Sequence, residues 1–139
     1  MNGQDFSRIV QEAFAPFLEG LGFQMDAMSI SGRFYRCSFS SLSNIVSISY
    51  EPGDDVLFIM VFSREGSRLS EIDDLSKTPR LSDLNKRYMS VVTADERIKN
   101  EFKFASVRAN DEEEMLLLKS AKELSLVLPK YLKDSKHSP

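Results

Sequence analysis

The chain has very few of the side chains that usually bind metals or perform nucleophilic catalysis. Its 139 residues include one cysteine, Cys37, one histidine, His137, and no tryptophan. One cysteine cannot form an internal disulfide, and a zinc site usually needs three or four ligands from Cys, His and carboxylates. Cys37 lies in an apolar alternating pattern, and His137 lies next to the C-terminal end. We therefore expect no metal, no cofactor and no His-dependent nucleophile.

Long apolar runs, phosphate-binding loops and positive charge are also missing. No apolar stretch approaches the ~18–20 residues that span a bilayer, and no basic-then-apolar signal opens the chain. The six glycines form neither a P-loop nor a dinucleotide-binding motif. The net charge is −3, whereas proteins that bind nucleic acid are usually basic. We expect a soluble cytoplasmic protein without membrane or nucleic-acid partners, and the sequence leaves its oligomeric state open.

The clearest pattern in the sequence is a β-hairpin over residues 44–63. Val46, Ile48 and Tyr50 alternate with serines, as in a strand with one wet face. The tetrapeptide Glu51-Pro52-Gly53-Asp54 is a strong turn signal. Residues 56–62 are apolar at nearly every position, so we expect that strand to be central or covered on both faces.

The rest of the chain predicts helices on either side of a strand meander. Apolar spacing predicts a helix over residues 6–21, capped by Asp5 and kinked or divided by Pro16. Period-two patterns predict strands at 23–30 and 33–40, the second with Tyr35, Cys37 and Phe39 on one face. Further elements are expected at these positions: a short helix at 69–75, a helix at 81–92, a helix beginning after the capping box at 93–96, a strand or extended link at 103–109, and a helix at 111–132 that Pro129 bends or ends.

Strands and helices in separate runs indicate an α+β fold and not a parallel α/β fold. We expect an N-terminal helix, an antiparallel meander of three to four strands, and C-terminal helices packed on the sheet. The composition, 42% hydrophobic and 28% charged, is that of one globular domain. We assign residues 1–133 to that domain and 134–139 to a flexible tail.

Acidic pairs are the remaining candidates for chemistry. Asp54–Asp55, Asp73–Asp74, Asp95–Glu96 and Asp111–Glu114 supply carboxylates for acid–base or magnesium chemistry if the fold brings two pairs together. A turn or the first turn of a helix explains most of them equally well, because helix dipoles favour acids there. Arg33–Arg36 interleaves charge with aromatic rings, as single-strand platforms do, but alternation already assigns two of these four residues to the core. We therefore expect a non-enzymatic protein.

Several segments together resemble small bacterial immunity proteins that protect against polymorphic or contact-dependent toxins. These segments are "FAPFLEGLGF" with Leu21-Gly22-Phe23, "FYRCSFSS", "IVSISYEPGDDVLFIMV" and "LLLKSAKELSLVLPKYL". The resemblance covers most of the chain and implies an α+β scaffold that binds a cognate toxin domain. It assigns no residue function. A second resemblance, to class I type III secretion chaperones, covers the first helix and the meander, but the long helical second half departs from that pattern.

Acidic loops are the candidate partner-binding surface. Toxins that attack nucleic acid are typically basic, and opposite charge speeds association. We predict that Glu51, Asp54 and Asp55 in the hairpin turn, with Asp73 and Asp74 in the following loop, contact the partner. Solubilising charge explains these residues equally well. The alternative function is a small enzyme or nucleotide-binding protein with a carboxylate or Arg/Lys site, which a deep polar pocket would favour.

Overall fold

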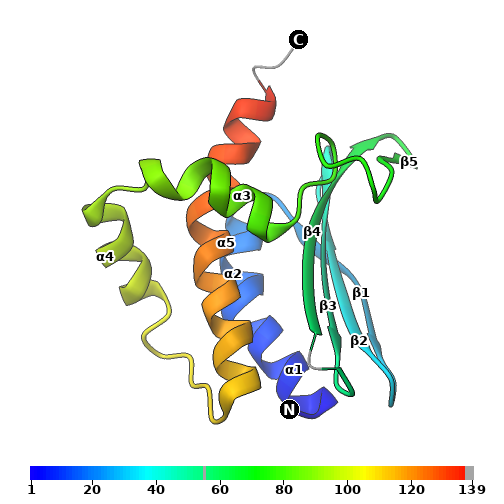
Figure 1. The fold of residues 1–139 in the computed structure, drawn as a ribbon, viewed down its shortest axis with the longest axis vertical. Coiled ribbons are helices and arrows are strands. Elements are labelled where there is room, and N and C mark those ends of the chain that lie inside the picture. The colour runs from blue at the N-terminus through cyan, green and yellow to red at the C-terminus, as the bar shows by residue number, and fades with distance from the viewer. Residues whose placement is uncertain (55, 137–139) are drawn as a thin grey trace.

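Helices cover one face of an antiparallel sheet, as the predicted α+β class requires (Figure 1). The structure is a computed structural model that describes residues 1–54 and 56–136. The strands form a meander in which each strand pairs with its neighbours in the chain, in the order β1-β2-β3-β4-β5. Their bounds are β1 Gln24–Ile30, β2 Tyr35–Ser40, β3 Asn44–Glu51, β4 Val56–Glu65 and β5 Arg68–Leu69.

Alternation along β2 and β3 determines which face of the sheet is buried. Tyr35, Cys37 and Phe39 of β2 are buried, and so are Val46, Ile48 and Tyr50 of β3, as predicted. β1 departs from strict alternation, because its register with β2 shifts between Met25 and Ala27. Such a bulge turns the later side chains of β1 to the opposite face.

The N-terminal helix is divided, as Pro16 predicts, but the irregularity lies before the proline. α1 (Gly3–Ile9) continues into a π-helical turn (Val10–Phe14) and then α2 (Ala15–Gly20). Pro16 lies in the first turn of α2, directly after the π-helical turn, and the first turn is the part of a helix in which proline is tolerated. The predicted cap is wrong: Asn2 caps α1, accepting a hydrogen bond from the N–H of Asp5 at 2.9 Å. Gly22, with φ of 93°, follows the helix end.

The second half of the chain is helical. α3 (Leu81–Tyr88) leads through a short 3₁₀ turn (Met89–Val91) to α4 (Ala94–Lys103), which begins with the predicted capping box of Thr93 and Glu96. α5 spans Glu112–Lys136 and continues through Pro129, so the predicted early end there is wrong. Residues 70–80 form turns and an edge segment in place of the predicted helix at 69–75. Residues 104–110 form a turn and an irregular link, and not the predicted strand.

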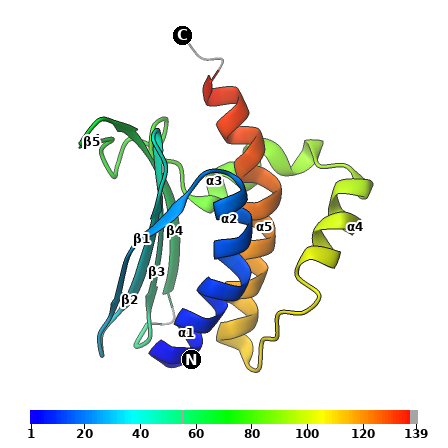
Figure 2. The same cartoon turned by 180° about the vertical axis from the view of Figure 1, so that it is seen from behind.

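The hydrophobic core lies between the inner face of the sheet and the helices. The most deeply buried large side chains come from α1 and the π turn, from β2 and β3, and from α5: they include Phe6, Ile9, Phe14, Phe39, Ile48, Tyr50, Leu117, Leu124 and Leu128. Figure 2 shows α1, α2 and α5 side by side on one side of the sheet. In the part of the chain that the structure describes, no helix is long and apolar enough to cross a membrane. His137 and the end of the expected tail lie outside the described residues.

Candidate functional site

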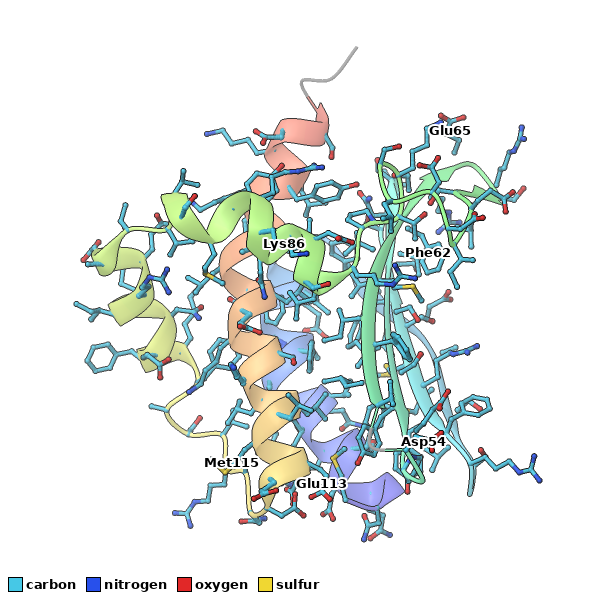
Figure 3. The ribbon with its side chains drawn as sticks, viewed as in Figure 1. Asp54, Phe62, Glu65, Lys86, Glu113 and Met115 are labelled. Atoms are coloured by element: carbon cyan, nitrogen blue, oxygen red, sulfur yellow. The ribbon has the colours of Figure 1, made fainter. Side chains whose placement is uncertain are left out.

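An apolar stripe runs along β4 on the face of the sheet that points away from the helices. Phe58, Met60 and Phe62 alternate with the buried residues of β4, so they occupy the opposite face. Ile45 of β3 lies opposite Phe62 and widens the stripe. Phe58 is 41% exposed, and the other three are half-buried. Ile45, Phe58, Met60 and Phe62 are called the outer-face stripe below, and Figure 3 labels Phe62.

Serines fill the middle of the same face. Ser38 and Ser40 of β2 lie opposite Ser47 and Ile45 of β3, and Ser47 lies opposite Met60. These side chains are small and uncharged, so another protein can approach the backbone closely there. A flat face made of serines beside an apolar stripe has the composition of an interface core, in which charged residues are depleted.

One arginine borders this face. The guanidinium of Arg36 lies 5.2 Å from the centre of the Phe34 ring, and its Nε donates a 3.4 Å hydrogen bond to Ser49. Phe34 is 38% exposed. A cation held over an exposed ring is suited to contact a partner, because both groups are positioned without being buried.

No described helix covers the outer-face stripe. Figures 1 and 2 show all the helices on the other side of the sheet. The sequence predicts that the strand at 56–62 is central or covered on both faces. β4 pairs with β3 along its length but with β5 at only two residues, and no described helix covers its outer face. A sheet with one solvated face usually carries polar residues on that face. Large apolar side chains there are typical of a surface that binds another molecule.

The structure does not bring the predicted acidic residues together. Glu51 and Asp54 lie at the β3–β4 turn, whereas Asp73 and Asp74 follow β5, near the other end of β4. The seven residue steps from Val56 to Ser63 correspond to about 23 Å of strand. Figure 3 shows Asp54 and Glu65, which mark the two ends of β4, far apart.

The individual carboxylates differ in how free they are to bind a partner. Glu51, Asp54 and Asp73 are exposed. Asp74 accepts hydrogen bonds from the hydroxyl of Ser76 and from its backbone N–H. The bond from the hydroxyl, and then the bond from the N–H, hold the pKa of Asp74 below its ordinary value. Its carboxylate therefore organises the loop. Asp55 lies outside the described residues, and the partner-binding role of all five remains a prediction.

The most buried charge of the described residues joins two helices. Glu114 of α5 is 2% exposed and accepts a 2.5 Å hydrogen bond from Arg8 of α1, which also contacts Glu12 and the carbonyl of Arg108. Burial, and then the nearby negative charge of Asp111, raise the pKa of Glu114. These contacts join α1 to α5, and Glu114 does not line the groove described below.

Cys37 has no feature of a nucleophile. The side chain is fully buried in the sheet, and burial raises the pKa of its thiol to about 12. A thiolate is the reactive form of cysteine, so Cys37 behaves as a small core residue. Among the described residues, no group of three or more His, Cys, Asp or Glu is arranged to hold a metal ion.

Comparisons with protein-family models, with curated proteins and with solved structures found no match to this chain.

The sequence predicts the strand that carries the stripe, but as a strand that is central or covered on both faces. The available signal was that β4 is apolar at consecutive positions, whereas its neighbour β3 alternates with serine. Since paired strands share their two faces, the serines of β3 already indicated a wet face, and Phe58, Met60 and Phe62 had to lie beside them.

Proposed function

We propose that this chain is a non-enzymatic protein-binding protein, and specifically an immunity protein that binds and neutralises a cognate toxin domain. The observation that carries the binding part of the proposal is the outer-face stripe. Its side chains are large and apolar, and they lie on a sheet face that no described helix covers. Aromatic and methionine side chains are enriched in protein interfaces for the same reason: their burial by a partner is favourable.

The size of the stripe suits a protein partner better than a small ligand. Small-molecule sites are concave and enclose most of the ligand. The stripe and the serine band form one face of an open sheet, where a small molecule would stay largely in water. A protein partner can cover all of that face at once, with Phe58 and Phe62 as central contacts.

The toxin part of the proposal rests on resemblance and charge. The order of segments, with Leu21-Gly22-Phe23 after the first helix, resembles small immunity proteins. The net charge of −3 favours a basic partner, and toxins that act on nucleic acid are typically basic. Such a partner would meet Glu51 and Asp54 at one end of the sheet.

The test is affinity capture followed by a growth assay. The tagged chain is used to capture partners from lysate of its native cells, and the partner is identified by mass spectrometry. The gene for the captured partner is then expressed in a heterologous host with and without this chain. We expect growth to stop when the partner is expressed by itself, and to be restored when this chain is expressed with it.

Matched variants connect the effect to the outer face. The double variant Met60→Ser/Phe62→Ser removes two stripe residues that point away from the core. Ile98→Ser/Phe102→Ser is the control, because Ile98 and Phe102 are 58% and 76% exposed on α4, away from the sheet. We expect only the first variant to lose capture and rescue. A partner without toxicity would contradict the immunity role, and a co-purifying small molecule in place of a protein would favour an enzyme.

A further inference from the structure

The edge of β4 has open amide donors at Leu57 and Ile59 in the described part of the chain. In an antiparallel strand, the N–H and C=O of one residue point to the same side, and successive residues alternate. The N–H groups of Val61 and Ser63 donate to the carbonyls of Pro79 and Lys77 at 3.0 and 3.1 Å, whereas the N–H of Arg64 donates to the carbonyl of Ser43 on the β3 side. The odd-numbered residues of β4 therefore face away from β3.

Leu57 and Ile59 face the same way, and their N–H groups lie beyond the last pair of the covering segment, Met60 with Arg80. The chain leaves the edge after Arg80, because α3 begins at the next residue. Within the described part of the chain, no hydrogen bond is formed by the N–H of Leu57 or of Ile59. The sheet thus presents two amide donors on one open edge, in a stretch of four residues that is about 13 Å long.

A groove of about 340 Å³ lies beside this edge, between β4 and the helices α3 and α5. Leu57, Leu81 and Leu116 line it from these three elements, and Leu116 is 43% exposed. The polar residues that line it include Asn85, whose side-chain oxygen is buried and accepts no hydrogen bond from any described residue. The groove therefore offers apolar contacts, one unused acceptor and the charged residues Arg80 and Glu123 next to the two amide donors.

We propose that this edge binds an extended segment of a protein partner, which adds a strand to the sheet beside residues 56–59. Strand addition satisfies the open backbone groups, and alternate side chains of the added segment enter the neighbouring groove. Natural sheets usually protect open edges with lysine, proline or inward-pointing charge. Residues 56–59, Val-Leu-Phe-Ile, carry none of these.

The two ends of the edge determine the chemistry of the added segment. One end is closed at Arg80, where the covering segment turns into α3. The other end opens at the β3–β4 turn, near Glu51 and Asp54, and Figure 3 shows Asp54 and Glu113 at this same end of the molecule. A segment that extends past the edge therefore meets carboxylates, so the added segment carries a lysine or arginine at that end and apolar residues at alternating positions.

A second copy of this chain fits the edge less well. Antiparallel pairing of two copies along residues 56–59 would place the β3–β4 turn of each copy against residues 77–80 of the other. An extended segment without such flanking structure avoids that overlap. The inference rests on the proposed function only in that the bound molecule is a protein. The edge is distinct from the outer-face stripe, although Phe58 of the stripe also lines the groove beside the edge.

The test selects binding peptides and maps where they bind. A phage-displayed library of random dodecapeptides is panned against the full chain, and enriched peptides are synthesised. We expect sequences with alternating apolar residues and a basic residue at one end. Amide hydrogen exchange then reports on the edge: the N–H groups of Leu57 and Ile59 should exchange faster than that of Val61 in the free chain, and peptide should slow both by roughly tenfold or more.

Two variants on neighbouring positions of α5 provide the control. Leu116→Arg places a long charged side chain in the groove, whereas Met115→Arg adds the same charge at a residue that does not line it. We expect only Leu116→Arg to raise the peptide Kd by roughly tenfold or more. The exchange experiment needs no variant, so a folding defect in Leu116→Arg leaves the inference testable.

The other outcomes contradict the inference. Failure to enrich any peptide, or protection of amides elsewhere, would show that the edge does not accept a strand. Amides of Leu57 and Ile59 that are protected in the free chain at high but not at low concentration would identify a second copy as the occupant. If Met60→Ser/Phe62→Ser abolishes partner capture while Leu116→Arg does not, the proposed function holds and the strand-addition inference fails.

Discussion

Residues on the two faces of the sheet should differ sharply in what they contribute to stability. Ile48 is fully buried against the helices, and its replacement by alanine removes apolar contacts and leaves a cavity. Such substitutions cost about 2–5 kcal/mol. Phe58 is 41% exposed on the outer face, so alanine there loses a little over half of a ring's transfer free energy and leaves no cavity, which costs about 1–2 kcal/mol.

These free energies correspond to measurable shifts in Tm, the midpoint temperature of thermal unfolding. The unfolding entropy of a 139-residue chain is about 0.3 kcal/mol per kelvin, so 1 kcal/mol shifts Tm by about 3–4 °C. We expect Ile48→Ala to lower Tm by about 7–17 °C and Phe58→Ala by about 3–7 °C. Urea unfolding at constant protein concentration should give the same order, with equal m-values for the two variants.

Equal costs for the two substitutions would refute the two-face interpretation. Phe58 would then be buried in solution, by a second copy or by another part of the chain, and the outer-face stripe would not be available to a partner. Repeating the measurement over a tenfold range of protein concentration separates these cases, because only burial by a second copy makes the cost depend on concentration.

Three further predictions concern charge, the thiol and a helix cap. Burial raises the pKa of Glu114, so the folded state binds its proton more readily than the unfolded state does, and wild type should gain stability relative to Glu114→Gln as the pH falls from about 7 to about 4. Glu96 should show the opposite pH dependence, because hydrogen bonds from Thr93 and Lys130 lower its pKa. Its contribution to the free energy of unfolding is therefore present at neutral pH and is lost as the pH falls. Urea unfolding of Glu114→Gln and Glu96→Gln across this pH range checks the two signs. Cys37 should react with a thiol reagent only after unfolding, so its labelling rate should rise with urea in parallel with the unfolded fraction, and rapid labelling of native protein would contradict its burial. Thr93→Ala removes the hydroxyl that accepts from the N–H of Glu96 and should destabilise α4 by about 1 kcal/mol, seen as faster amide exchange in α4, with exchange in α5 unchanged.

Much of the fold was predictable because local patterns and tertiary packing agree. The alternation of Val46, Ile48 and Tyr50 matches their burial, and the Thr93 capping box begins a helix as expected. The predictions fail where another residue or the tertiary packing outweighs the local pattern. Asn2 caps the first helix in place of Asp5, because the helix starts one turn before its apolar stripe. α5 continues through Pro129, because packing of a long helix outweighs the loss of one backbone hydrogen bond.

The candidate surface was harder to predict, because it depends on which face of the sheet the helices cover. Hydrophobic periodicity shows that residues 56–62 are apolar on both faces, but it cannot show whether an element exists to cover the second face. The open edge at Leu57 and Ile59 depends on where the chain turns into α3. The acidic residues were grouped by sequence proximity, and the strand between them keeps Asp54 and Asp74 apart.

The most direct test of the central claim is the affinity of the captured partner for wild type and for Met60→Ser/Phe62→Ser, measured by isothermal titration calorimetry. If the outer-face stripe is the binding surface, the double variant should raise Kd by about 100-fold, which corresponds to about 2.7 kcal/mol, while Ile98→Ser/Phe102→Ser should leave Kd within about twofold of wild type. A wild-type Kd for Met60→Ser/Phe62→Ser, with unchanged stability, would show that this chain binds its partner through a different surface.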